Sequence, residues 1–199
     1  MKSSMWNPRL STSALVLIPA AVGINYIGKL FAGLLKLPLW LDSIGTVLSA
    51  MLAGPVVGAI CGAINNIIYG LTMDPISFIY ALTSIGIGLA VGVMAHKGRI
   101  NSIVNAVLVG LVAAVVSTLI STPINIGFWG GQTGNVWGDL VYAGMVAHHY
   151  PVWIASLVDE FIVDVPDKIA TVIVAYGIYK GLPQKLTILF RHDSVTEQL

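Results

Sequence analysis

The sequence predicts an all-α membrane protein, built as a bundle of six transmembrane helices. Apolar residues make up 56% of the 199 residues and charged residues only 10%, well below the roughly 25% of a typical soluble domain. The apolar residues arrive in blocks that can each cross a hydrocarbon core, which takes about 20 helical residues. Among Asp, Glu, Lys and Arg, only Lys29 and Asp42 interrupt these blocks, which are residues 12–35, 41–71, 76–95 and 103–123.

The first two blocks predict three helices. Residues 12–35 form the first, while the block over 41–71 is too long for one span at 1.5 Å per residue. Proline cannot continue the backbone hydrogen-bond ladder. We therefore expect Gly54-Pro55 to divide this block into shorter helices near 41–53 and 56–71.

The remaining blocks predict three more helices. A fourth, near 76–95, is entered through Asp74-Pro75, and a fifth, near 103–123, ends at Pro123. Residues 124–150 are rich in Gly, Trp and polar side chains, which favours a long loop. A final helix is expected over 161–182, after an irregular or interfacial lead-in.

The chain is predicted to form one membrane domain over residues 12–183, because no polar linker divides the blocks. Residues 1–11 and 184–199 would be cytoplasmic ends, the first a retained N-terminus rather than a signal peptide. This orientation follows the positive-inside rule. It places most basic residues inside and the 124–150 loop outside, the inside residues being Lys2, Arg9, Lys97, Arg99, Lys180, Lys185 and Arg191.

Small residues recur at four-residue intervals, and they allow close approach of helices within lipid. Such stripes predict packing within the bundle, and they comprise Gly58/Gly62/Asn66/Gly70, Ser84/Gly88/Gly92/His96 and Ala106/Gly110/Ala114/Thr118. The first helix carries small residues at the same spacing. We expect it to dock a partner membrane protein through Pro19, Gly23, Gly28 and Ala32.

The main group of charges lies at the start of the last helix. Glu160, Asp164 and Lys168 are spaced by four residues, so their side chains share one helix face. One interpretation is an interfacial cluster with an Asp164–Lys168 ion pair. The other is a cavity that binds a polar ligand, since charges inside a membrane often mark functional sites.

Further candidates for ligand contact lie at the same expected depth. Asn66 and Tyr69 are near the outer end of the third helix, and Tyr80 near that of the fourth. Each also has a structural interpretation, as a hydrogen bond between helices or as part of an aromatic belt. The loop and lead-in add Trp129, Trp137, His148, Trp153 and Asp159.

Other classes of site are not favoured. His148 and His149 are adjacent, so on a helix they point in different directions, and no HExxH-like spacing occurs. We expect neither a metal nor another cofactor. The net charge of +1 and the absence of a basic cluster exclude a nucleic-acid-binding surface. No Walker-type phosphate-binding loop is present, so any ATP hydrolysis belongs to another chain.

An ordered set of short motifs spans about residues 12–183. It runs from Leu41-Asp42-Ser43-Ile44-Gly45-Thr46 through Gly54-Pro55, Asn65-Asn66 and Asp74-Pro75 to Pro166-Asp167-Lys168 and Leu182-Pro183. In this order the motifs resemble the substrate-binding S components of energy-coupling factor (ECF) transporters. The resemblance implies a six-helix, non-catalytic subunit that captures a vitamin or related micronutrient from outside.

The resemblance also implies partners and ligand positions. The subunit would release its solute inward by toppling within a complex with a transmembrane coupling protein and two cytoplasmic ATPases. Ligand contacts would come from the outer loops and outer helix ends, here Trp40, Asp42, Met73, Asp74, Tyr80, Trp129, Trp137, Asp139, His148 and Asp159 to Asp164. The first helix lacks the Ala-x-x-x-Ala pattern with which the family often docks its coupling protein.

Two other functions fit the sequence. A self-sufficient secondary transporter would move its solute without an ATPase, although no inverted repeat is apparent in the spans. An intramembrane metal-dependent enzyme would place His148 or His149 with Asp159 or Asp164 around an ion.

Overall fold

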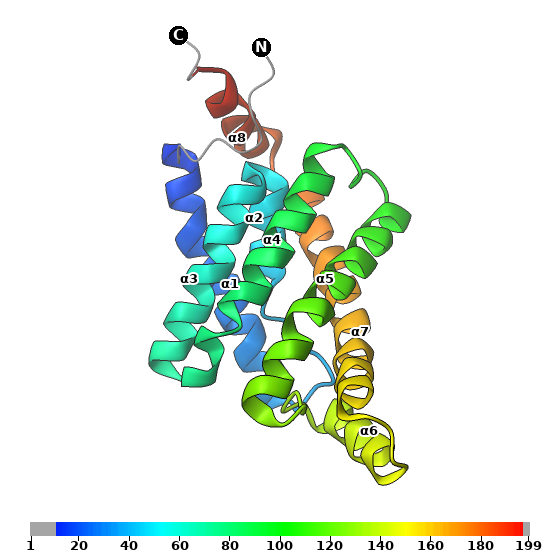
Figure 1. Cartoon of the computed structure of the whole chain (residues 1–199). Coiled ribbons are helices and arrows are strands. Elements are labelled where there is room, and N and C mark those ends of the chain that lie inside the picture. The colour runs from blue at the N-terminus through cyan, green and yellow to red at the C-terminus, as the bar shows by residue number, and fades with distance from the viewer. Residues whose placement is uncertain (1–10, 197–199) are drawn as a thin grey trace.

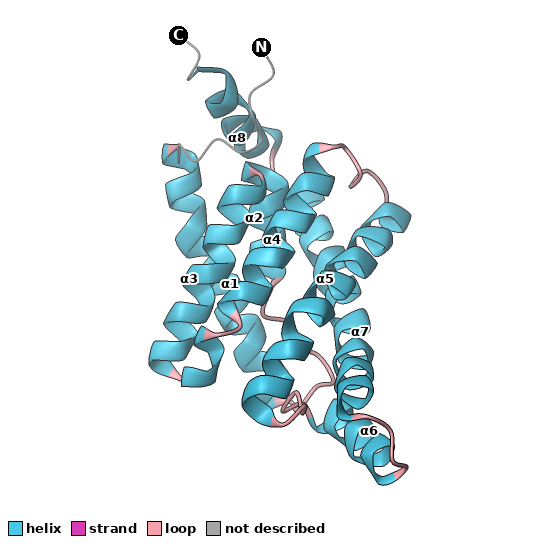
Figure 2. Ribbon diagram, viewed as in Figure 1, coloured by secondary structure: helices cyan, strands magenta, loops and turns pink. Residues whose placement is uncertain are grey.

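The computed structural model describes the backbone of residues 11–196 and the side chains of residues 11–190. Within this part the chain is all-helical, without strands (Figure 1, Figure 2). Its elements are α1 (Thr12–Leu34), α2 (Ile44–Ala53), α3 (Pro55–Thr72), the 3-10 helix η1 (Pro75–Phe78), α4 (Ala81–His96), α5 (Ile103–Trp129), α6 (Val136–Ala147), α7 (Val152–Gly181) and α8 (Gln184–Thr196). The expectations for residues 1–10 and 197–199 lie outside the described residues.

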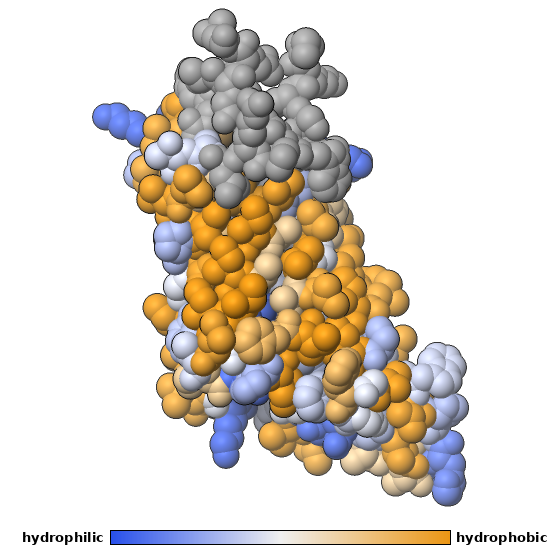
Figure 3. Space-filling view, turned by 60° about the vertical axis from the view of Figure 1, so that its left-hand side comes forward, coloured by the Kyte–Doolittle hydropathy of each residue, from blue (hydrophilic) through white to orange (hydrophobic). Residues whose placement is uncertain are grey.

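Three helices are long and apolar enough to cross a membrane: α1, α3 and α5. These helices indicate that the protein inserts into a membrane. Figure 3 shows a broad hydrophobic band around the middle of the molecule, with hydrophilic atoms toward both ends. Exposed apolar side chains on α1 and α5, which suit contact with lipid, include Leu15, Val16, Ile27, Leu108 and Leu119.

Six separate spanning helices are not confirmed among the described residues. α2 has only 10 residues, so it is about 15 Å long and cannot cross the hydrocarbon core alone. Its residues from Ile44 to Ala50 are all buried. α2 is thus a short helix inside the bundle, and the extended connection over residues 35–43 leads into it.

The break at Gly54-Pro55 is confirmed. Gly54 has φ 90, a left-handed value that favours glycine, and Pro55 is the first residue of α3. Pro is well tolerated at that position because its missing N–H would have no partner within the helix.

Pro123 does not end α5, contrary to the prediction, because the helix continues to Trp129. Neighbouring helices and polar side chains can satisfy the backbone groups that a proline frees within an apolar span. The helix ends instead at Gly130, whose backbone is left-handed with φ 66.

The predicted loop over 124–150 is also largely helical. It contains the end of α5 and all of α6, which begins where the Asn135 side chain accepts a hydrogen bond from the Trp137 amide at 3.1 Å. α7 begins at Val152 rather than near residue 161, so the predicted irregular lead-in is helical too. The polar tail likewise forms α8.

The glycine stripes pack helices against each other, as predicted. A Cβ atom built on Gly62 would lie 2.8 Å from Ser84 Cβ, and one built on Gly88 would meet the backbone of Gly58. These two contacts join α3 to α4. A Cβ on Gly110 would lie 2.7 Å from Ile169 Cα, which shows how closely α5 approaches α7.

The bundle has two distinct ends (Figure 1). α8 and the start of α1 lie at one end, while α6 and the connection that follows α1 lie at the other. The side chains that line the main cavity belong to the half of the molecule that includes α6.

Candidate functional site

A cavity of about 120 Å³ lies among α1, α4, α5 and α7, next to η1 and the connection over residues 35–43. Its lining combines charged groups, hydroxyl groups and a few apolar walls. The lining residues are Lys29, Trp40, Asp42, Ser43, Asp74, Ile76, Ser77, Tyr80, Thr83, Ser84, Ile87, Ser117, Ser121, Asn125, Thr133, Glu160, Asp164 and Lys168.

Helical periodicity explains why α5 and α7 both turn polar faces to this cavity. On α5, Ser117, Ser121 and Asn125 follow at four-residue steps, so they lie along one face. On α7, the predicted set of Glu160, Asp164 and Lys168 has the same spacing. Two polar stripes on adjoining helices therefore form one continuous wall.

Lys168 is the centre of the charge network. Its Nζ donates a 2.6 Å hydrogen bond to Asp167 Oδ2 and lies 3.6 Å from Asp164 Oδ1 and 3.8 Å from Asp42 Oδ1. The ammonium group is almost fully buried, so these carboxylates supply the compensation that a buried charge requires.

Asp167 also holds the connection over residues 35–43 against α7. Its Oδ1 accepts hydrogen bonds from the backbone amides of Trp40, at 3.0 Å, and Leu41, at 2.8 Å. Leu41 has a positive φ of 50, a conformation that costs energy for a residue other than glycine. The buried Asp167 carboxylate helps to stabilise that conformation.

Lys29 supplies the second ammonium group in the cavity lining. Its Nζ lies 3.9 Å from Asp42 Oδ2, donates to Ser77 Oγ at 3.2 Å, and sits 4.2 Å from the centre of the Tyr69 ring. Burial by itself would raise the pKa of Asp42. The nearby ammonium groups of Lys168 and Lys29, with the Ser43 hydroxyl, outweigh that effect and lower its pKa.

The carboxylates on α7 receive hydrogen bonds from α5. Asn125 Nδ2 donates to Glu160 Oε2 at 2.9 Å, and Tyr80 donates its hydroxyl proton to the Asn125 side-chain oxygen. Thr118 donates to Asp164 Oδ2 at 3.1 Å, whereas Asp164 Oδ1 has no hydrogen-bond partner. The carboxylates of Glu160 and Asp164 are therefore oriented by hydrogen bonds, but Asp164 Oδ1 accepts none from the described residues.

The turn between α5 and α6 brings Thr133 to the cavity. The Thr133 hydroxyl donates to Asp159 Oδ1 at 3.0 Å, and its amide donates to Asp139 Oδ1, also at 3.0 Å. The turn needs glycine at Gly131 and Gly134, where φ is 103 and 79. Two carboxylates thus fix this turn over one side of the cavity.

The structure brings several of the predicted ligand contacts together. Tyr80, Glu160, Asp164 and Lys168 line the cavity directly. Four other predicted residues do not line the cavity but contact residues that do. Tyr69 lies beneath Lys29, and Asn66 donates to Ser84 at 2.7 Å. Asp139 and Asp159 accept hydrogen bonds from Thr133.

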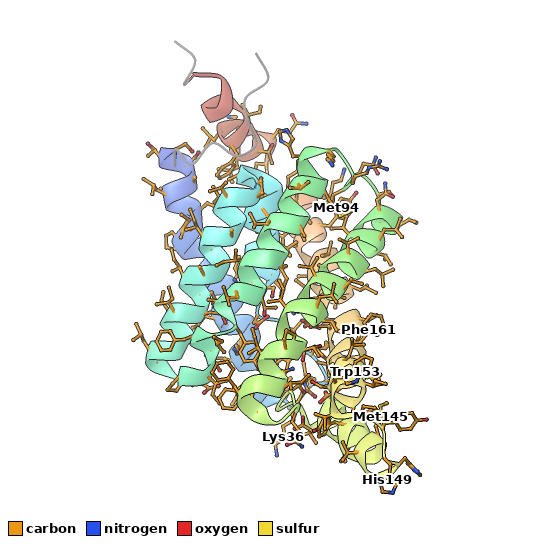
Figure 4. All side chains as sticks on the ribbon, viewed as in Figure 1. Lys36, Met94, Met145, His149, Trp153 and Phe161 are labelled. Atoms are coloured by element: carbon orange, nitrogen blue, oxygen red, sulfur yellow. The ribbon has the colours of Figure 1, made fainter. Side chains whose placement is uncertain are left out.

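Four others of the predicted contacts also lie outside the lining. Trp153 is 60% exposed and Trp137 is 55% exposed, and Trp129 and His148 also face outward. Figure 4 shows His149 directed away from the bundle, at the turn between α6 and α7. The tryptophans do not cover the cavity in this conformation.

Several lining residues were not predicted as ligand contacts. Lys29 and the α5 residues Ser117, Ser121 and Asn125 belong to this set, as do Thr83 and Thr133. The α5 stripe carried a signal, since three polar residues at four-residue spacing are unusual within an apolar span. It was overlooked because the neighbouring stripe of small residues already explained helix packing.

The four small residues of α1 separate into two groups. Gly28 packs against the backbone of Leu41, and Ala32 is only 3% exposed. Pro19 and Gly23 instead line a shallow apolar groove of about 450 Å³ between α1 and α3, with Ile18, Val22, Tyr26, Ile27, Ile64 and Ile68. The surface that remains open for a partner is therefore the Pro19 end of α1.

No metal-binding group appears in the described residues: no three His, Cys, Asp or Glu side chains there are placed to share an ion. His148 and His149 are exposed, whereas Asp159 and Asp164 are buried within the bundle. This arrangement gives no support to the metal-dependent enzyme.

Comparisons with protein-family models, with curated proteins and with solved structures found no match to this chain. Its function must therefore be argued from the cavity and its surroundings.

Proposed function

We propose that this protein is the solute-capture subunit of an ECF-type importer. It binds a vitamin or related small micronutrient at the outer face of a prokaryotic plasma membrane. The observation that carries the proposal is a partly open cavity with charged and hydroxyl side chains in its lining, between the helices of a membrane protein, next to the bundle end that holds α6. Ligand sites of this kind are concave and depend on a few directed polar groups.

The proposed topology has six membrane passages with both termini in the cytoplasm. α1, α3, α4, α5 and α7 provide five, and the connection over residues 35–43 with α2 provides the sixth. Three basic residues support this orientation: Lys97 and Arg99 follow α4, and Lys185 lies in α8. Both places are at the end of the bundle opposite α6 (Figure 1), as the positive-inside rule requires.

The proposed subunit is not an enzyme, and its energy comes from partner chains. A transmembrane coupling protein and two cytoplasmic ATPases would complete the importer, with docking at the groove beside Pro19 and Gly23. The solute would be released inward when the subunit topples within that complex. The cavity supports capture because its carboxylates are oriented by hydrogen bonds before any ligand enters.

The test is to identify small molecules that leave the gently purified full-length protein on denaturation, by mass spectrometry. We expect one solute, and we expect Ser121→Phe to abolish it because the new ring fills the cavity. Leu119→Phe is the matched control, since Leu119 lies on the same helix but is 63% exposed. If no solute is released, or if the Ser121→Phe variant retains it, the proposal is wrong.

A second measurement separates the proposed importer subunit from the secondary transporter. The released solute is offered to vesicles that contain this chain alone. Uptake without an ATPase would contradict the proposed function, whereas binding without uptake would support it.

A further inference from the structure

The charges that line the cavity do not balance. Its carboxylates are Asp42, Asp74, Glu160 and Asp164, whereas its ammonium groups are only Lys29 and Lys168. Lys168 is moreover engaged most closely by Asp167, at 2.6 Å. The lining therefore holds more carboxyl groups than ammonium groups, and ionisation of the excess carboxyl groups would leave negative charge that the lining does not compensate.

The uncompensated charge is concentrated on α7. Glu160 and Asp164 are one helical turn apart, 5% and 1% exposed, and both line the cavity. Like charges at this spacing destabilise a helix, and buried carboxylates require a partner. Glu160 receives a hydrogen bond from the Asn125 amide, which carries no charge.

The hydrogen bonding of Asp164 also indicates that the solute carries a donor, and it does so independently of the charge balance. Its Oδ1 is buried and accepts no hydrogen bond from any described residue. The nearest cation, Lys168 Nζ, is 3.6 Å away, which is outside the range of an N–H···O hydrogen bond. An acceptor left open inside a cavity is suited to a donor brought by the solute.

The size and walls of the cavity limit that solute. An apolar cavity of roughly 150 Å³ holds one benzene molecule, so about 120 Å³ limits the solute to one small ring, and further atoms of the solute would lie at the open side of the cavity. Trp40 and Tyr80 provide aromatic groups in the lining, and Ile87 provides an aliphatic one. An aromatic face attracts cations, and it also attracts other flat rings.

We infer that the solute is a small organic cation, with one ring and a positively charged, hydrogen-bond-donating group that binds between Glu160 and Asp164. This inference rests on the proposed function, because it names the class of solute that the capture site takes. The cation would donate to the open Asp164 oxygen and compensate the paired carboxylates.

The test uses three compounds of nearly equal shape: benzamidine, which is cationic at neutral pH, benzamide, which is neutral, and benzoate, which is anionic. Each is titrated into purified full-length protein, freed of endogenous solute, by isothermal calorimetry. We expect benzamidine to bind at least about tenfold more tightly than benzamide, since one charge-assisted hydrogen bond contributes that much. Benzoate should not bind.

Two variants locate the recognition. Asp164→Asn and Glu160→Gln should each weaken benzamidine binding by about tenfold or more, while leaving any benzamide binding unchanged. Thr171→Val is the control: Thr171 is equally buried on the same helix but does not line the cavity, and its hydroxyl makes no hydrogen bond with any described residue that the change would remove. It should bind benzamidine like the wild-type chain.

The inference is overturned if benzamide or benzoate binds as tightly as benzamidine, or if none of the three binds. It is also overturned if Thr171→Val weakens binding as much as the other two variants. These results would leave solute capture intact if the molecule released from the protein were neutral or anionic. Absence of any released solute would instead remove the proposed function itself.

Discussion

Asp167 on α7 accepts a 2.8 Å hydrogen bond from the backbone amide of Leu41, 126 residues earlier in the chain. The same carboxylate accepts from the amide of Trp40 and pairs with Lys168. A single buried side chain therefore joins a backbone connection, a cavity wall and the main cation of the site.

Replacing Asp167 by alanine should lower the stability of the protein strongly. The change removes the carboxylate oxygen that accepts from both backbone amides and leaves Lys168 with weaker partners, and breaking a buried ion pair in this way costs about 3–5 kcal/mol. Asp167→Asn keeps an acceptor for Trp40 and Leu41 and should lose less. In thermal unfolding experiments in detergent, we expect the melting temperature to fall in the order wild type, Asp167→Asn, Asp167→Ala. An equal loss of stability in both variants would refute this role of Asp167.

Gly88→Ala should disrupt the contact between α3 and α4. The added Cβ would meet the backbone of Gly58, which cannot move without shifting α3, and overpacking of this kind costs about 1–3 kcal/mol. Gly177→Ala is the control, because nothing lies within 4 Å of a Cβ there. The control should be neutral or slightly stabilising. Similar melting temperatures for the two variants would show that the close approach is not required.

Asp42→Asn should destabilise the protein to the same extent at pH 5.5 and at pH 8, by about 1–3 kcal/mol. The folded protein lowers the pKa of Asp42, through Lys168 and Lys29 acting against burial. Its contribution is therefore complete above the unfolded pKa, and it is lost only as the pH falls through the lowered folded value. Melting curves of both proteins at the two pH values check this, and a difference that shrinks at pH 5.5 would contradict it.

Thr133→Val should loosen the turn between α5 and α6. The change removes the hydrogen bond to Asp159 and one from the Asn135 amide, and a net contribution of about 1 kcal/mol corresponds to roughly fivefold faster amide exchange. Hydrogen–deuterium exchange of residues 130–135 measures this. Thr72→Val, on the exposed end of α3, should leave the turn unchanged, and faster exchange there as well would point to general destabilisation.

If the groove on α1 docks the coupling protein, Gly23→Leu should impair uptake of the solute by intact cells while leaving binding to the purified subunit intact. Gly33→Leu is the matched control. Gly33 lies on the same helix and also has open space around it, but it is outside the groove. Loss of binding in Gly23→Leu, or equal uptake by both variants, would exclude this face.

Local signals allowed much of the fold to be predicted from the sequence. The Gly54-Pro55 break is encoded by two residues whose backbone preferences act within one turn. The glycine stripes of α3 and α4 are equally local patterns. α6 was missed because the glycines and tryptophans of residues 124–150 are typical of loops, whereas the Asn135 cap and the packing of Gly138 against Asp159 favour a helix there.

The candidate site was predictable where a charge interrupts an apolar helix. Glu160, Asp164 and Lys168 stand out for that reason, and all three line the cavity. Lys29 also interrupts an apolar helix, but its role was not predicted because its partners Asp42 and Ser77 are distant in sequence and meet it only after the bundle forms. The exposed tryptophans were misleading because an indole in a loop looks the same in sequence whether it covers a ligand or faces lipid.

Asp167 and Lys168 are consecutive, yet one holds the backbone at Leu41 and the other reaches into the cavity. A solute that draws Asp164 toward itself would shift the ammonium group of Lys168 toward its remaining partners, Asp42 and Asp167. On the proposed function, binding of a solute would then change the ion pairs of the segment before α2, in addition to any direct contact with Trp40 or Asp42. Asp167 and Lys168 would in this way link the filling of the cavity to the backbone at Leu41.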